Sequence, residues 1–159
     1  MKKLFIILIL VVIFLFSACS KESKFGIEQF TERMNSQFGT NYNTADFILG
    51  TDSEGEKYML YEEGDTLISV SLDANGTIKG AALLVTDGGD IAGCIDTYKK
   101  VCCVLTGDDE STQSSTLTNC GITADKIKYA DSNTVNTVGK YKYTAICNTS
   151  SVTLFCERA

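Results

Sequence analysis

Histidine, proline and tryptophan are all absent from this chain of 159 residues. Without histidine, catalytic triads of the familiar Ser-His-Asp kind and histidine-based metal sites are excluded. Basic residues number 14 against 20 acidic ones, which gives a net charge of −6. Because phosphate backbones are held mainly by clustered Lys and Arg, and no such cluster occurs, we expect no nucleic-acid partner. The length suits one globular domain. The chain is too short for a multidomain enzyme.

The N-terminus carries the most specific signal in the chain. Residues 1–20 read MKKLFIILILVVIFLFSACS, in which two lysines precede an apolar run and small residues follow it. This order is typical of an export signal peptide. The apolar run from Leu4 to Phe16 is shorter than the roughly 20 residues that a membrane-spanning helix needs. The sequence therefore predicts export.

Phe16-Ser17-Ala18-Cys19 resembles the lipobox of bacterial lipoprotein precursors, which is an apolar residue and two small residues ahead of a cysteine. It departs from the usual pattern at Phe16, where lipoboxes mostly carry Leu. The resemblance implies a signal peptide over residues 1–18, cleavage before Cys19, and a diacylglyceryl group on the thiol of Cys19. The membrane would then be contacted through this lipid, since two acyl chains give stable attachment. Residues 19–24 are short and polar and form the predicted tether.

Residues 25–159 are expected to form a single α+β domain with a largely antiparallel sheet and two main helices, in the order α-ββββ-α-βββ. One helix is predicted from the apolar spacing of Phe25, Ile27, Phe30, Met34 and Phe38, and ends near Gly39. The second is predicted from the stripe of Ile91, Cys94, Ile95, Tyr98, Val101, Cys102 and Leu105. The polar segment from Gly107 to Asn119 is either a loop or a short helix capped by Asp108 or Asp109.

Short apolar or alternating runs separated by turn residues predict seven strands. These runs cover residues 45–49, 56–62, 67–73, 77–86, 126–130, 139–148 and 152–157. Asp73-Ala74-Asn75-Gly76 resembles part of a calcium loop, but the remaining ligand positions are missing. Asn-Gly between alternating strands favours a hairpin turn instead.

Six cysteines follow Cys19, and all of them lie in the C-terminal half of the chain. They are Cys94, Cys102, Cys103, Cys120, Cys147 and Cys156. An even number in an exported chain predicts disulfides, although the spacing does not define the pairs. The alternative is that they pack as small apolar side chains, as Cys94 and Cys102 would on the second helix. The spacing matches no zinc motif, so we expect no metal and no cofactor.

Three groups of acidic residues could in principle supply paired carboxylates for glycoside hydrolysis or oxygen ligands for a divalent cation. They are Glu62-Glu63-Asp65, Asp87-Asp90 and Asp108-Asp109-Glu110. All of them fall at expected turns or helix starts, where acidic residues commonly serve as caps.

Two functional hypotheses follow. The first is a lipid-anchored binding or interaction module of the bacterial envelope, on the outer face of the cytoplasmic membrane or in the periplasm, holding an envelope protein or a small ligand. The alternative is a small carboxylate-based hydrolase acting on envelope glycans. The first is favoured because no motif in residues 25–159 is specific for catalysis.

Overall fold

The computed structural model describes residues 24–159. The predicted signal peptide, the lipobox-like segment and all of the tether but its last residue lie outside the described residues. Within residues 24–159, no helix is both long enough and apolar enough to cross a membrane.

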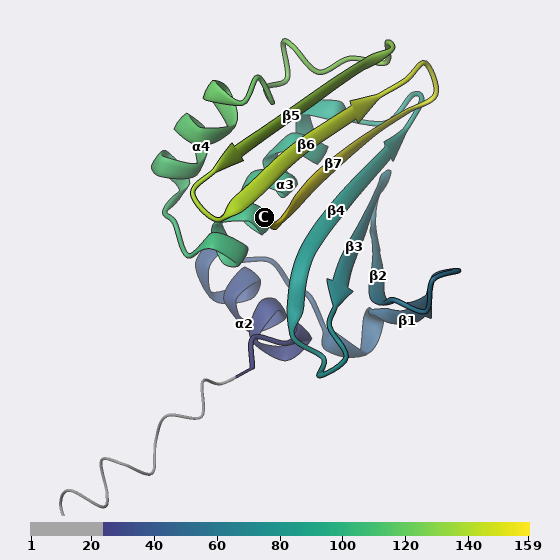
Figure 1. Cartoon of the computed structure of the whole chain (residues 1–159), viewed down its shortest axis with the longest axis vertical. Coiled ribbons are helices and arrows are strands. Elements are labelled where there is room, and N and C mark those ends of the chain that lie inside the picture. Colours follow the sequence, from purple (N-terminus) through teal and green to yellow (C-terminus); the bar gives the residue numbers. More distant parts are fainter. Residues whose placement is uncertain (1–23) are drawn as a thin grey trace, which may run out of the picture.

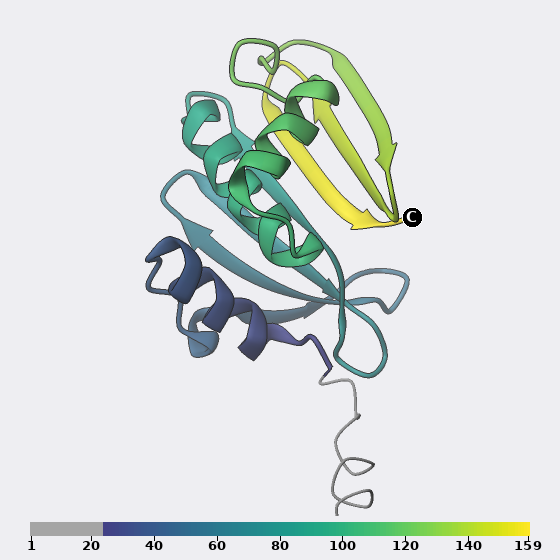
Figure 2. The ribbon, with the colours of Figure 1, turned by 90° about the vertical axis from the view of Figure 1, so that its left-hand side faces the viewer.

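The described chain forms a single α+β domain built on one seven-stranded antiparallel sheet, which confirms the expected fold class. The helices are α2 (Ile27–Phe38), α3 (Ile91–Thr106) and α4 (Glu110–Asn119), and a short 3-10 helix, η1, covers Thr44–Asp46. The strands are β1 (Ile48–Thr51), β2 (Lys57–Glu63), β3 (Thr66–Leu72), β4 (Ile78–Thr86), β5 (Ser132–Val138), β6 (Tyr141–Cys147) and β7 (Ser151–Arg158). Figures 1 and 2 show all three α-helices on the same face of the sheet.

The strand order is β1-β2-β3-β4-β7-β6-β5, and it gives the sheet a symmetry that the sequence does not show. The meander β2-β3-β4 and the meander β5-β6-β7 run in opposite senses and meet where β4 pairs with β7. The first meander follows α2, η1 and β1, and the second follows α3 and α4. The sheet therefore consists of two halves joined at the β4–β7 seam, each containing a three-stranded meander, and the first half carries the additional edge strand β1.

Both halves begin with the same kind of tight turn. Glu63 pairs with Thr66 in the first half and Val138 pairs with Tyr141 in the second, so two residues connect each hairpin. The first connecting residue is Gly64 with φ 58° or Gly139 with φ 61°. A positive φ at this position of a two-residue hairpin favours glycine.

The core lies between the helices and the sheet face that they cover. In β3 the residues alternate strictly, with Ile68 and Val70 buried beneath the helices and Ser69 pointing to the other face. The helices contribute Phe30 and Met34 from α2, and Tyr98 from α3, all with no exposed surface. This is the arrangement that the alternating and helical patterns predict.

Two details of the sequence prediction need correction. The segment 126–130 is not a strand; it is an irregular connection in which Ile127 is buried and the Tyr129 hydroxyl donates to the Gly89 carbonyl at 3.2 Å. The first strand of the second half is instead β5, which the sequence analysis did not identify. The segment 107–119 contains helix α4, whose N-cap Asp109 accepts a hydrogen bond from the Thr112 amide at 2.7 Å.

Candidate functional site

The face of the sheet opposite the helices is not covered by any element of the described chain (Figures 1 and 2). Because side chains alternate along a strand, the register defines which residues share this face. One row crosses the whole sheet and consists of Ile48, Leu60, Ser69, Ala82, Phe155, Thr144 and Val135. Most of these side chains are apolar or small. We call this surface the uncovered face.

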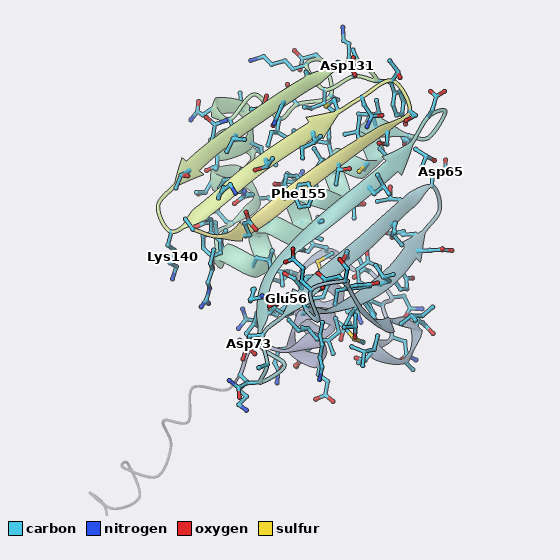
Figure 3. All side chains as sticks on the ribbon, turned by 45° about the vertical axis from the view of Figure 1, so that its right-hand side comes forward. Glu56, Asp65, Asp73, Asp131, Lys140 and Phe155 are labelled. Carbon is cyan, nitrogen blue, oxygen red and sulfur yellow. The ribbon has the colours of Figure 1, made fainter. Side chains whose placement is uncertain are left out.

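The lower part of the uncovered face is hollowed between two aromatic residues. The hollow has a volume of about 250 Å³ and is lined by residues of β2, β3, β4 and β7. Its floor is formed by Ser69, Ser71, Gly80 and Ala82, and its aromatic members are Tyr58 and Phe155. Figure 3 shows Phe155 near the middle of this face, with Glu56 between it and Asp73. We call this feature the sheet hollow.

Glycines create the shape of the sheet hollow at two places. At Gly80 a Cβ atom would come within 2.7 Å of the Cys156 carbonyl oxygen and 2.9 Å of the Glu157 Cα, so β4 and β7 approach closely there. At Gly50 a Cβ atom would come within 2.2 Å of the Tyr58 ring. The ring of Tyr58 therefore lies over its cross-strand partner Gly50. At both positions the absence of a side chain is what allows the neighbouring atoms to approach this closely.

The rim of the sheet hollow carries charges of both signs. Lys79 forms an ion pair with Glu56, and Lys142 forms one with Glu157 at 2.8 Å. Asp52 also lines the hollow, where its carboxylate accepts hydrogen bonds from the amides of Glu54 and Glu56, both at 2.9 Å. A second depression of about 420 Å³ continues the hollow toward Asp73. The rim can therefore contact polar or charged groups of a ligand, while the floor of small residues leaves room for a flat or extended part of that ligand.

The acidic groups singled out from the sequence are only partly brought together. Asp65 lies against Gly89, which would place a Cβ 3.1 Å from it, so the β2–β3 turn meets the turn that holds Asp87 and Asp90. Asp90 serves as the N-cap of α3 and accepts from the Gly93 amide at 3.0 Å. The Asp108-Asp109-Glu110 group begins α4 instead. No group of three His, Cys, Asp or Glu residues within 24–159 is arranged to hold a metal ion.

Several of these carboxylates have structural partners. Glu63 accepts a hydrogen bond from the Tyr42 hydroxyl at 2.6 Å, and burial together with this carboxylate raises the pKa of Tyr42. Asp73 accepts from the amides of Asn75 and Thr77, both at 2.8 Å, which holds its pKa below the usual value. The Asp73-Ala74-Asn75-Gly76 segment therefore forms a turn between β3 and β4. The carboxylates of Glu63 and Asp73 therefore have structural roles.

All six cysteines of the described chain are buried and carry free thiols. Burial raises the pKa of Cys94 to about 11 and that of Cys103 to about 11. The thiols of Cys102 on α3 and Cys156 on β7 interact directly across the core. The expectation of disulfides stays a prediction.

A different depression lies on the helix side of the molecule. It has a volume of about 270 Å³ and lies between α3, α4 and the segment that follows α4. Ile95, Leu117 and Ile122 give it an apolar lining, and the ion-paired Asp96 and Lys99 lie at the same place. The ion pair has an N···O distance of 3.1 Å. The lining is mainly apolar, and its few polar groups do not define the chemistry of a particular ligand.

The residues that shape the sheet hollow were not predicted from the sequence. The alternation of Ser69 and Ser71 did indicate that one face of β3 is polar, but nothing local placed them beside Phe155. That proximity comes from the pairing of β4 with β7, which are separated by two helices in the sequence.

Comparison with protein-family models, with curated proteins and with solved structures finds no significant match to this chain.

Proposed function

We propose that the chain is a lipid-anchored, extracytoplasmic binding or interaction module of the bacterial cell envelope, and that its uncovered face is the binding surface. Export and anchoring are supported by the signal-peptide pattern and by the lipobox-like Phe16-Ser17-Ala18-Cys19. The binding surface is supported by one observation in particular. An aromatic-flanked hollow lies at the only junction between the two halves of the sheet, on the face that no described element covers.

The composition of the sheet hollow supports binding more than catalysis. Tyr58 and Phe155 offer apolar ring surface, and Ser69 and Ser71 make the floor partly polar. Binding sites typically combine aromatic surface with a few directed polar groups. A glycoside hydrolase would need two carboxyl groups in different protonation states beside the substrate. Here the carboxylates of Glu56 and Glu157 are each matched by a lysine.

Anchoring is tested by replacing Cys19 with alanine in the full chain expressed in bacterial cells. We expect incorporation of labelled lipid to disappear, and unprocessed precursor to accumulate, because the thiol that receives the diacylglyceryl group is gone. Ser20→Ala is the matched control and should be lipidated and processed normally. Normal maturation of Cys19→Ala, with unchanged membrane partition, would show that the lipoprotein proposal is wrong.

The binding surface is tested separately by placing a photo-crosslinking phenylalanine analogue at single positions of the full chain. Position 58 probes the sheet hollow, and position 115, on the exposed surface of α4, is the control on the opposite side. Irradiation of living cells should give discrete crosslinked products from position 58 and not from position 115. Equal products from both positions, or products from position 115 alone, would reject the uncovered face as the binding surface.

A further inference from the structure

Strand β5 forms one edge of the sheet and pairs only with β6 in the described chain. Its sequence, SNTVNTV, contains no charged residue and no proline. Val135 is 54% exposed and Val138 is 44% exposed. Its pairing with β6 is continuous from Ser132 to Val138, so no bulge distorts the edge. Natural sheet edges are usually guarded by charges, prolines, bulges or a covering segment, and β5 lacks the first three.

The charges at the two ends of β5 are arranged so that the strand is complementary to itself. Asp131 directly precedes the strand and Lys140 follows it in the turn to β6. Both are exposed, and neither forms an ion pair within residues 24–159. Figure 3 shows them at opposite ends of the strand. In an antiparallel pair of two β5 strands centred on Val135, Asp131 of each copy lies opposite Gly139 of the other, one residue from Lys140, so the acidic end of each strand meets the basic end of its partner.

The opposite edge of the sheet, β1, does not have this property. It is only four residues long and is followed by the acidic connection that contains Asp52, Glu54 and Glu56. Antiparallel pairing of two β1 strands centred on Leu49 would bring Asp46 of one copy opposite Asp52 of the other. Like charges placed opposite one another disfavour strand pairing. The two edges therefore differ in charge pattern even though both expose apolar residues.

We infer that two copies of the chain associate through β5, in a two-fold symmetric antiparallel pair centred on Val135. The two sheets then form one continuous sheet, and the two-fold axis perpendicular to it places both uncovered faces on the same side. The described chain begins beside α2, away from β5 (Figure 1), so the pairing leaves the tethered end free. A dimer would present two copies of the sheet hollow on one surface, which favours a repetitive or symmetric partner.

The first experiment tests the register with engineered cysteines in the full chain, kept in its native membranes. Val135→Cys should form an intermolecular disulfide under mild oxidation, because residues on the axis of an antiparallel pair lie about 4.5–5.5 Å apart. Ile48→Cys, on the β1 edge, is the matched control, since Ile48 is 70% exposed. We expect at least a tenfold higher dimer yield from Val135→Cys. Equal yields, or no dimer from Val135→Cys, would overturn the proposal.

Co-expression of two variants makes the test stricter. In the inferred register, position 133 of one copy is opposite position 137 of the other. Cells that contain both Asn133→Cys and Thr137→Cys should therefore give more crosslinked dimer than cells that contain either one alone. If each variant alone crosslinks as well as the mixture, the chains do not pair in this register and the inference is wrong.

A charge exchange tests the complementarity of the two strand ends. Asp131→Lys brings two lysines within one residue of each other at both ends of the paired strands, and it should raise the dissociation constant of the detergent-solubilised dimer roughly tenfold. Adding Lys140→Asp restores opposite charges at both strand ends and should return the constant to within about threefold of the original. Both positions are exposed, so circular dichroism should show an unchanged fold. A double variant as weak as the single one would refute the charge complementarity of the two strand ends.

Discussion

Replacement of Gly80 by alanine should destabilise the protein because it inserts a methyl group into the β4–β7 seam. The new Cβ would lie 2.7 Å from the Cys156 carbonyl oxygen and 2.9 Å from the Glu157 Cα. Backbone atoms of a central strand cannot rotate away as a side chain can. Strand β7 would have to move by a few tenths of an ångström, with consequences for both halves of the sheet.

The magnitude follows from two opposing effects. Overpacking in a well-packed region costs about 1–3 kcal/mol. Substitution of glycine by alanine also restricts the unfolded chain, which stabilises the folded state by about 0.4–1 kcal/mol. We therefore expect Gly80→Ala to lower the free energy of unfolding by about 1–2 kcal/mol. Since the Gly80 backbone forms part of the floor of the sheet hollow, ligand binding should weaken as well.

Gly50→Ala is the matched control, because the new methyl group would meet a side chain there and not the backbone of a neighbouring strand. Its Cβ would meet the Tyr58 ring at 2.2 Å, and a half-exposed ring at the sheet edge can swing aside. We expect its free energy of unfolding to change by less than about 0.5 kcal/mol, as for most surface substitutions. The displaced Tyr58 ring should nevertheless alter the near-ultraviolet circular dichroism.

Urea unfolding followed by far-ultraviolet circular dichroism, on the chain from residue 20 onward, measures both variants. The midpoint should fall for Gly80→Ala and stay nearly constant for Gly50→Ala, with unchanged slopes. A Gly80→Ala variant as stable as the original would show that β4 and β7 are not closely apposed at this point. The reverse order of the two variants would contradict the distinction between backbone and side-chain obstacles.

Three further predictions concern the buried thiols and helix α4. At pH 8 under reducing conditions, the native Cys94 and Cys103 thiols should be alkylated about a hundredfold more slowly than ordinary thiols, because a pKa of about 11 lies two units above the reference value of 9.0. Because the unfolded thiols ionise at a lower pH than the folded ones, the free energy of unfolding should decrease as the pH rises from about 9 to 11. The thermal midpoint should therefore stay constant with respect to these two thiols below about pH 9 and decrease between about pH 9 and pH 11. Asp109→Ala should cost about 1 kcal/mol and speed hydrogen exchange in residues 110–119, whereas Asp108→Ala, which removes no cap, should not.

Periodicity was sufficient to predict the elements that have a strong apolar face. The helices α2 and α3 and the strands β3 and β4 were predicted because their buried residues recur at the spacing of one helical or strand face. Helix α4 stayed ambiguous because only Gln113 and Leu117 are buried in it, so its apolar face is nearly absent. Its cap, Asp109, was the better signal.

The second half was harder to predict because its edge strand is polar. In β5, Val135 and Val138 are the only strongly apolar residues, and both are exposed. The segment 126–130 has more apolar character than β5, yet Ile127 anchors it to the core as an irregular connection. An edge strand is held by backbone pairing with its neighbour, so its own side chains carry little information about it.

The position of the sheet hollow also depends on contacts that no local pattern contains. Phe155 projects into the hollow, while its backbone carbonyl accepts a hydrogen bond from the Tyr98 hydroxyl of α3 on the other side of the sheet. Tyr98 has no exposed surface, and its neighbours Cys102 and Cys156 fill the same part of the core. The strand that presents Phe155 to a ligand is thus held in place from beneath by α3. The shape of the uncovered face is therefore determined by the buried packing at the β4–β7 seam as much as by the residues that line the hollow.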